Sequence, residues 1–246
     1  MHIALLADIH ANLAALHAAL DHAEARHPVD RLWVLGDTVG YGPRPNECIA
    51  LLRRYPHDAI SGNHDLAALG RMETTWFNEP AAEAAAWTAR SLSDESRQFL
   101  ESLPEVVTSG EWTLVHGTLR EPATEYLFST SAATAHLDLQ STPFCAVGHT
   151  HIPTLAYVPP DALYATIGGV PEGTVLDRGQ EQPAVLNPGG IGQPRDGDPR
   201  SAYALLDTDA GTVTFHRVPY DIAATQQAMT EAALPQRLID RLSVGR

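Results

Sequence analysis

Short hydrophobic runs, each followed by a polar cluster and then a helical pattern, recur along the N-terminal part of the chain. The run at residues 3–7 is uninterrupted, which is typical of a strand buried on both faces. Asn12 can then cap a helix whose apolar positions keep helical spacing to about Arg26. The unit repeats with a strand at residues 32–35 and a helix opened by Pro45. Strand–helix units of this kind predict βαβ crossovers and a largely parallel sheet.

The rest of the chain carries other patterns. Residues 79–103 are predicted to be helical, and a hairpin is predicted around Gly110. Later apolar runs are short and broken by Gly and Pro, which indicates a β-rich second half. The tail from about residue 222 has a helical pattern interrupted by Pro235. Because no repeat or linker divides the chain, we expect a single domain over residues 1–246.

Composition narrows the class of protein. The 246 residues, 44% hydrophobic and 19% charged, have the balance of a globular chain that can bury a core. The formal net charge of −14 repels nucleic-acid backbones, so no long nucleic acid is expected as substrate. Cys48 and Cys145 form no CxxC pair and indicate no disulfide framework. The N-terminus lacks a basic region and no apolar run is long enough to span a membrane, so we expect a cytoplasmic protein without a membrane partner.

Five predicted strand ends carry side chains that commonly bind metals, in the motifs "DIH", "GD", "GNHD", "HG" and "GHTH". Each motif alone is more simply a cap, a turn or a core residue, but five together are hard to explain in that way. The carboxyl ends of strands in an α/β sheet face one crevice, so the motifs can converge. Oxygen and nitrogen ligands without sulfur suit Mn²⁺, Fe²⁺, Zn²⁺, Co²⁺ or Ni²⁺, and this many ligands suit two such divalent metal ions. The candidates are Asp8, His10, Asp37, Asn63, His116, His149 and His151.

This ordered set resembles the motifs of the calcineurin-like metallophosphoesterases, D-x-H, G-D, G-N-H-D/E, H and G-H-x-H. The resemblance implies an α/β fold, a four-layer αββα sandwich with two mixed sheets flanked by helices. It also implies two metal sites that share one carboxylate: Asp8, His10 and His151 at one, Asn63, His116 and His149 at the other, and Asp37 at both. The segment after "GD" departs from the Ser/Thr protein phosphatase pattern, which argues against that activity.

The resemblance further implies that His64 stays off the metals and faces the leaving group, as a general acid or a stabiliser of developing charge. Asp65 either orients His64 or caps the helix that follows. Tyr41, Arg44 and Arg195 are candidates to line the substrate pocket, since a guanidinium matches the geometry of phosphate. For each of these three, a surface turn or a structural ion pair is an equally simple interpretation.

We therefore expect metal-dependent hydrolysis of phosphoester bonds, as a phosphodiesterase or phosphatase on small or nucleotide-like substrates, through a hydroxide that bridges the two cations. One alternative is a symmetrical dinucleoside polyphosphate hydrolase. Another is a non-catalytic scaffold that retains the fold, although a scaffold would be expected to have lost ligands or His64. A nuclease fits poorly with the acidic net charge and the lack of a basic stripe. The sequence leaves the oligomeric state open.

Overall fold

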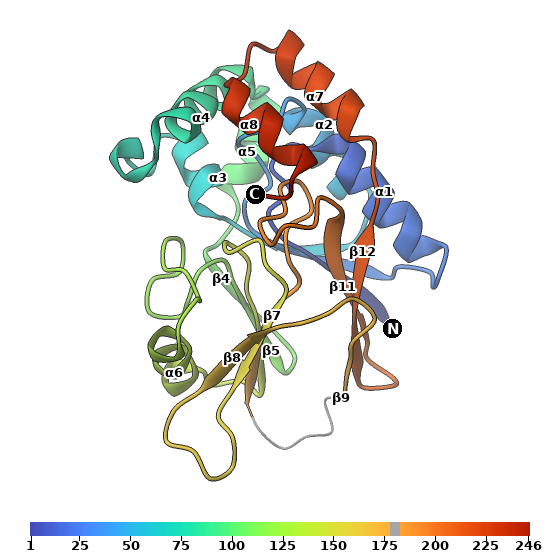
Figure 1. The fold of residues 1–246 in the computed structure, drawn as a ribbon, viewed down its shortest axis with the longest axis vertical. Coiled ribbons are helices and arrows are strands. Elements are labelled where there is room, and N and C mark those ends of the chain that lie inside the picture. Colours follow the sequence, from blue (N-terminus) through green and yellow to red (C-terminus); the bar gives the residue numbers. More distant parts are fainter. Residues whose placement is uncertain (178–182) are drawn as a thin grey trace.

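The computed structural model describes residues 1–177 and 183–246. Its strands form two six-stranded sheets that face each other, with helices on the outer sides (Figure 1). In spatial order, the first sheet contains β3 (His57–Ile60), β2 (Arg31–Leu35), β1 (His2–Leu6), β11 (Ser201–Asp207), β12 (Thr212–Val218) and β9 (Val175–Asp177). The second contains β4 (Val106–Ser109), β5 (Trp112–Val115), β6 (Phe144–Ala146), β10 (Ala184–Asn187), β7 (Thr154–Tyr157) and β8 (Thr166–Gly169). The expected αββα sandwich with two mixed sheets is confirmed.

Parallel and antiparallel pairs occur in both sheets. Strands β1, β2 and β3 are parallel, because α1 (Leu13–Glu24) and α2 (Pro45–Leu52) carry the chain back between them. Strands β11, β12 and β9 extend that sheet with antiparallel pairs. The second sheet combines the parallel pairs β5–β6 and β6–β10 with antiparallel pairs toward both edges. The prediction of a largely parallel sheet holds for β1–β3 and for β5, β6 and β10, and it is wrong for the other strands, which form antiparallel pairs.

Apolar layers on both faces of the first sheet explain its uninterrupted hydrophobic runs. Between the sheets, Leu5 and Trp33 pack with Trp112 and Leu114, and the two tryptophan ring centroids lie 5.5 Å apart. On the outer side of the first sheet, α1 and α2 cover a second apolar cluster. Helix α6 (Thr130–Leu139), which the hydrophobic pattern did not predict, covers the outer side of the second sheet.

The remaining helices gather at one end of the molecule (Figure 1). They are α3 (Asn63–Ala68), the 3₁₀ turn η1 (Thr74–Trp76), α4 (Glu79–Ser91), α5 (Asp94–Glu101), α7 (Ile222–Glu231), α8 (Gln236–Asp240) and the 3₁₀ turn η2 (Arg241–Ser243). Asn12 caps α1 as predicted, accepting the N–H of Ala15 at 3.2 Å. Pro235 separates α7 from α8, also as predicted. No helix in the described parts of the chain is long and apolar enough to cross a bilayer.

Candidate active site

The five motifs follow strands of both sheets and come together where the sheets meet. Asp8 and His10 follow β1, Asp37 follows β2, and Asn63 opens α3 after β3. From the second sheet, His116 follows β5 directly, and the "GHTH" loop follows β6. All seven candidate ligands are at most 7% exposed. The strand ends therefore bring carboxylates, an amide and imidazoles into one buried cluster.

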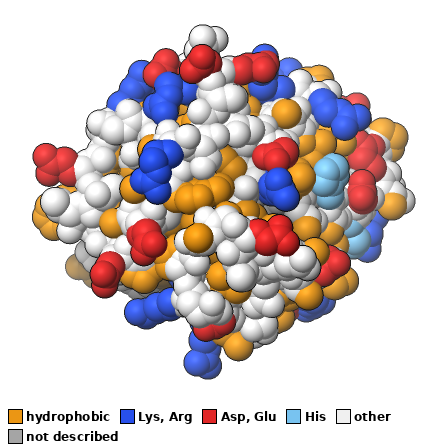
Figure 2. Space-filling view, turned by 90° about the horizontal axis from the view of Figure 1, so that it is seen from above, with side chains coloured by type: hydrophobic (Ala, Val, Ile, Leu, Met, Phe, Trp, Pro, Cys, Tyr) orange, Lys and Arg blue, Asp and Glu red, His pale blue; other side chains and the backbone are white. Residues whose placement is uncertain are grey.

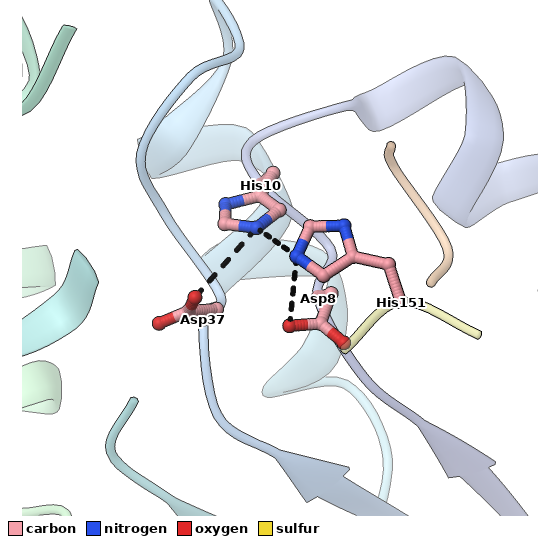
Figure 3. A group of neighbouring side chains, drawn as sticks. All are labelled: Asp8, His10, Asp37 and His151. Carbon is pink, nitrogen blue, oxygen red and sulfur yellow. Dashed lines mark hydrogen bonds and ion pairs between the residues drawn. The ribbon is translucent and has the colours of Figure 1, made fainter. Parts of the chain in front are cut away.

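The first group of potential ligands is formed by Asp8, His10, Asp37 and His151, whose ligand atoms all lie within 4.8 Å of one another (Figure 3). His10 Nε2 lies 3.6 Å from Asp37 Oδ2 and 3.2 Å from His151 Nε2. His151 Nε2 in turn lies 3.3 Å from Asp8 Oδ1. Four side chains from three separate loops thus point toward one small space.

The second group is formed by Asp37, His116 and His149, again with ligand atoms within 4.8 Å of one another. His116 Nε2 lies 3.4 Å from Asp37 Oδ2 and 3.2 Å from Asn63 Oδ1. The neutral oxygen of Asn63 therefore faces this second group. Asp37 belongs to both groups, and its Oδ2 atom lies between a histidine of each.

Backbone carbonyls set the orientation of the four histidine rings. Each ring donates one N–H to a carbonyl oxygen, and the pairs are His10 Nδ1 to Val39 at 3.1 Å, His116 Nδ1 to Leu35 at 2.7 Å, His151 Nδ1 to Gln193 at 2.5 Å and His149 Nε2 to Thr124 at 3.1 Å. In the neutral form of each ring, a proton on this nitrogen leaves the other nitrogen with a lone pair directed at the cluster. Metal-ligating histidines are held in this way.

Five of the seven candidate ligands have left-handed backbone conformations, which L-amino acids rarely adopt. The φ angles are 53° for Asp8, 48° for His10, 50° for Asp37, 66° for His149 and 60° for His151. Such strain persists only where the surrounding structure enforces it, and it concentrates at functional sites. The backbone here is bent to aim these side chains at one point.

The chemistry of the cluster fits divalent cations. Asp8 and Asp37 each have a buried Oδ2 atom without a hydrogen-bond partner, and burial raises the pKa of Asp8 to about 7. Burial also lowers the pKa of His149 to about 3, so this imidazole is neutral, the form that binds metals. Burial would lower the pKa of His116 too, but the charge of Asp37 outweighs it and raises this pKa to about 9. The buried carboxylates therefore demand a positive charge at this place.

His64 lies beside the cluster and belongs to neither ligand group. Its backbone N–H donates to Asp37 Oδ1 at 2.8 Å. The imidazole packs against Tyr41 and Phe77, with ring centroids 4.2 and 4.7 Å away. A Cβ added at Gly40 would come within 2.6 Å of His64 Nδ1, so this side of the ring lies tightly against the backbone. The position suits a side chain that approaches the substrate and not the metals.

The Asp65 carboxylate accepts hydrogen bonds from the backbone around the site. Its carboxylate accepts the N–H of Gly62 at 3.0 Å, which caps α3. It also accepts the N–H groups of Thr38 at 3.3 Å and Val39 at 3.0 Å, in the loop after β2. These contacts favour the capping interpretation of Asp65 over the orientation of His64, and they tie the "GNHD" segment to the loop that carries Asp37.

The three candidate substrate-binding residues lie in two different places. Tyr41 and Arg195 line a cavity of about 380 Å³ next to the ligand groups, and an Arg195 amino group donates to the Tyr41 hydroxyl at 3.4 Å. Arg44 does not line this cavity. It is exposed and pairs with Glu47 at 3.3 Å, as expected for neighbouring charges in the first turn of α2. The structure therefore does not bring Arg44 to the site.

Several residues that line the same cavity were not predicted from the sequence. Tyr126 stacks on the ring of His149 at a centroid distance of 3.8 Å, and Arg237, Arg241 and Arg246 come from the C-terminal segment. The available signal was the arginine pair at positions 237 and 241, which a helix places on one face in an otherwise acidic chain. Nothing in the sequence indicated Tyr126.

Comparison with known proteins agrees with this geometry. A family model for the calcineurin-like phosphoesterase superfamily domain matches residues 1–211. The crystal structure of a metallophosphoesterase from Sphaerobacter thermophilus is 44% identical, covers 100% of this chain and 99% of that chain, and superimposes with a TM-score of 0.88. An uncharacterized protein of Methanocaldococcus jannaschii is 33% identical over 250 residues, 99% of this chain and 98% of the relative.

A shorter match relates part of the chain to an enzyme of stated activity. The symmetrical bis(5'-nucleosyl)-tetraphosphatase of Psychromonas ingrahamii is 34% identical over 67 residues, which is 26% of this chain and 24% of that enzyme. The family match, by contrast, covers most of the chain and includes all seven buried ligand candidates. The chain therefore belongs to the calcineurin-like phosphoesterase superfamily and is a metal-dependent phosphoester hydrolase.

Proposed function

We propose that the protein hydrolyses small or nucleotide-like phosphoesters with two divalent cations. The observation that carries this proposal is the sharing of Asp37 between two buried ligand groups, with its Oδ2 atom between His10 and His116. The first cation would be held by Asp8, His10, Asp37 and His151, and the second by Asp37, Asn63, His116 and His149. When bound, such a pair supplies Lewis acidity toward phosphoryl oxygens and lowers the pKa of water.

The chain's own residues position the substrate around that pair. His64 would contribute at the leaving group, because it lies next to Asp37 without joining either ligand group. Burial lowers the pKa of His64 to about 4, so near neutral pH it acts as a neutral hydrogen-bond donor to the departing oxygen. Arg195 and Tyr41 would hold phosphoryl oxygens at the near wall of the cavity.

A specific observation also favours a second candidate, a symmetrical dinucleoside polyphosphate hydrolase. The cavity beside the ligand groups is lined by tyrosines and arginines, which can accommodate bases and several phosphates. The partial match to the tetraphosphatase of Psychromonas ingrahamii supports the same choice. This activity would be a special case of the proposed function, with the same ligand groups.

Hydrolysis of bis-p-nitrophenyl phosphate by protein reconstituted with Mn²⁺ tests the proposal. We expect turnover that chelation abolishes and that added Mn²⁺ restores, with about two metal equivalents bound per chain. A comparison with p-nitrophenyl phosphate then separates diester from monoester preference. A folded, metal-loaded sample without turnover of either ester would refute the proposed activity and favour the non-catalytic scaffold.

A further inference from the structure

The C-terminal helices add basic side chains to the cavity beside the ligand groups. Arg237 lies on α8, Arg241 begins η2, and Arg246 follows it, and all three line the cavity together with Arg195. The three C-terminal arginines lie beyond residue 211, where the family match ends. This end of the molecule shows both basic and acidic side chains around a hydrophobic centre (Figure 2). Three of the four arginines of the cavity therefore come from the segment that follows the residues matched by the family model.

In the described part of the chain, Arg195, Arg237 and Arg241 have no acidic side chain as a partner, although the net charge is −14. Within residues 1–177 and 183–246, no Asp or Glu side chain forms an ion pair with Arg195, Arg237 or Arg241. Arg200 and Arg217 differ in this respect, because Arg200 pairs with Asp198 and Arg217 pairs with Asp196. An acidic protein that leaves this set of arginines unneutralised around a cavity has a place there for an anion from solution.

The burial of Arg195 and Arg241 and the repulsion between their charges further favour the binding of an anion. The Nε atom of Arg195 is buried without a hydrogen-bond partner. Burial, together with the charges of Arg195 and Arg237, lowers the pKa of Arg241 to about 10. One Arg241 donor is satisfied by the carbonyl oxygen of Arg246, which helps to hold the guanidinium at the cavity. Guanidinium groups placed in this way match phosphate oxygens in charge and in geometry.

An aromatic wall faces the arginines. Tyr126 lines the cavity and is 43% exposed, with one face stacked on His149. Phe128 lies parallel to it, at a centroid distance of 5.3 Å and an interplanar angle of 6°. Phe128 is the outer ring of this stack and is 56% exposed, so its ring can stack against a nucleobase next to the basic cavity. A simple phosphomonoester would use neither this wall nor the arginines.

We infer that this cavity binds a second phosphate group of the substrate, one that is not cleaved, so that the preferred substrates are nucleotides with more than one phosphate group. This inference rests on the proposed function, since the phosphoryl group that reacts would lie at the ligand groups. The arginines of the C-terminal segment select for the additional phosphates. Bis-p-nitrophenyl phosphate, which has a single phosphorus atom, lacks the group that they recognise.

A pair of double variants tests the arginine site. Arg237→Gln with Arg241→Gln removes two cavity charges, and Arg54→Gln with Arg90→Gln removes two exposed charges elsewhere as the matched control. With Mn²⁺, kcat/KM for diadenosine tetraphosphate relative to bis-p-nitrophenyl phosphate should fall about 10- to 100-fold in the cavity variant, mainly through KM. The control should keep the wild-type ratio. An unchanged ratio in the cavity variant would overturn the inference.

Binding provides a readout that is independent of turnover. At a fixed free Mn²⁺ concentration, calorimetry should show that wild type binds a methylene-bridged ATP analogue at least about tenfold more tightly than AMP. The cavity variant should lose this preference, and Arg237→Lys with Arg241→Lys should recover part of it. Equal affinities in wild type would refute the second-phosphate site even if esters are hydrolysed. Absence of ester turnover with the preference intact would refute the proposed function alone.

Discussion

Replacing Gly62 by alanine should disturb both ligand groups through one methyl group. Gly62 precedes α3 at the turn that presents Asn63, and it lies against the loop that carries Asp37. An added Cβ would lie 2.2 Å from Asp37 Oδ1 and 2.5 Å from the Asp37 backbone nitrogen. A Cβ atom essentially never approaches a non-bonded heavy atom within 3.0 Å, so residue 62 and the Asp37 carboxylate must move apart by at least about 0.8 Å.

The size of the effect follows from that displacement. Metal–ligand distances tolerate about 0.2 Å, and disturbing the groups that support a ligand typically lowers metal affinity about 10- to 100-fold. Because Asp37 is shared, affinity should fall at both sites. The overpacked contact should also lower the free energy of unfolding of the metal-free protein by about 1–3 kcal/mol. Calorimetric titration with Mn²⁺ and urea denaturation in a chelator measure the two effects.

Gly168→Ala is the matched control, because nothing lies within 4 Å of a Cβ added there and the residue is exposed on β8. This variant should bind Mn²⁺ and unfold like wild type. The reasoning would be refuted if Gly62→Ala bound two equivalents with wild-type affinity and unfolded at the wild-type urea concentration. That result would mean that the loop after β2 adjusts freely and does not fix Asp37.

Three further substitutions test individual side chains. Asp37→Asn keeps the shape but removes the shared charge, so metal analysis should show loss at both sites, and full loading would contradict bridging. His64→Ala should keep both metals and lower the rate of ester hydrolysis about 10²–10⁴-fold. His17→Ala, on the exposed side of α1, is the control. Loss of metal in the His64 variant would instead identify His64 as a ligand. Burial lowers the pKa of His136 to about 4, below the unfolded value of about 6.5. The buried neutral ring therefore contributes to the free energy of unfolding in full above pH 6.5, and this stabilisation is lost as the pH falls toward 4. His136→Asn, which keeps an acceptor for the Leu119 N–H, should therefore lose stability less steeply than wild type between pH 7 and 4.5 in urea denaturation, and parallel curves would contradict this.

The convergence of the candidate ligands could be predicted from the sequence because their positions follow from local structure. A strand that ends in a tight turn places the next side chains at its carboxyl end, and the order of parallel strands brings neighbouring ends together. Asp8, Asp37 and Asn63 needed only β1, β2 and β3 to be parallel, as their helical crossovers require. The histidines of the second sheet were candidates because their motifs also follow predicted strands, and the resemblance to a family then divided the ligands between two sites.

The pairing of strands distant in sequence and the direction of individual side chains could not be predicted as well from the sequence. The hydrophobic pattern identifies β10 as a strand, but not that it enters between β6 and β7. Arg44 is close to Asp37 along the chain, yet the start of α2 turns it toward Glu47. The orientation of Arg237 and Arg241 depends on Leu238 and on the packing of α8 against residues distant in sequence. These outcomes depend on tertiary contacts that local spacing does not encode.

The ligand groups lie at the seam between the two sheets, that is, where the loops of the first sheet meet those of the second, and this position affects how the protein acquires its metal ions. Each ligand group takes side chains from both sheets, so neither half of the sandwich offers a complete coordination sphere when it stands alone. Cation binding therefore reports correct docking of the halves and adds its free energy to that docking. Chelation should loosen the molecule along this seam first, so that metal supply governs the lifetime of the folded protein as well as its chemistry.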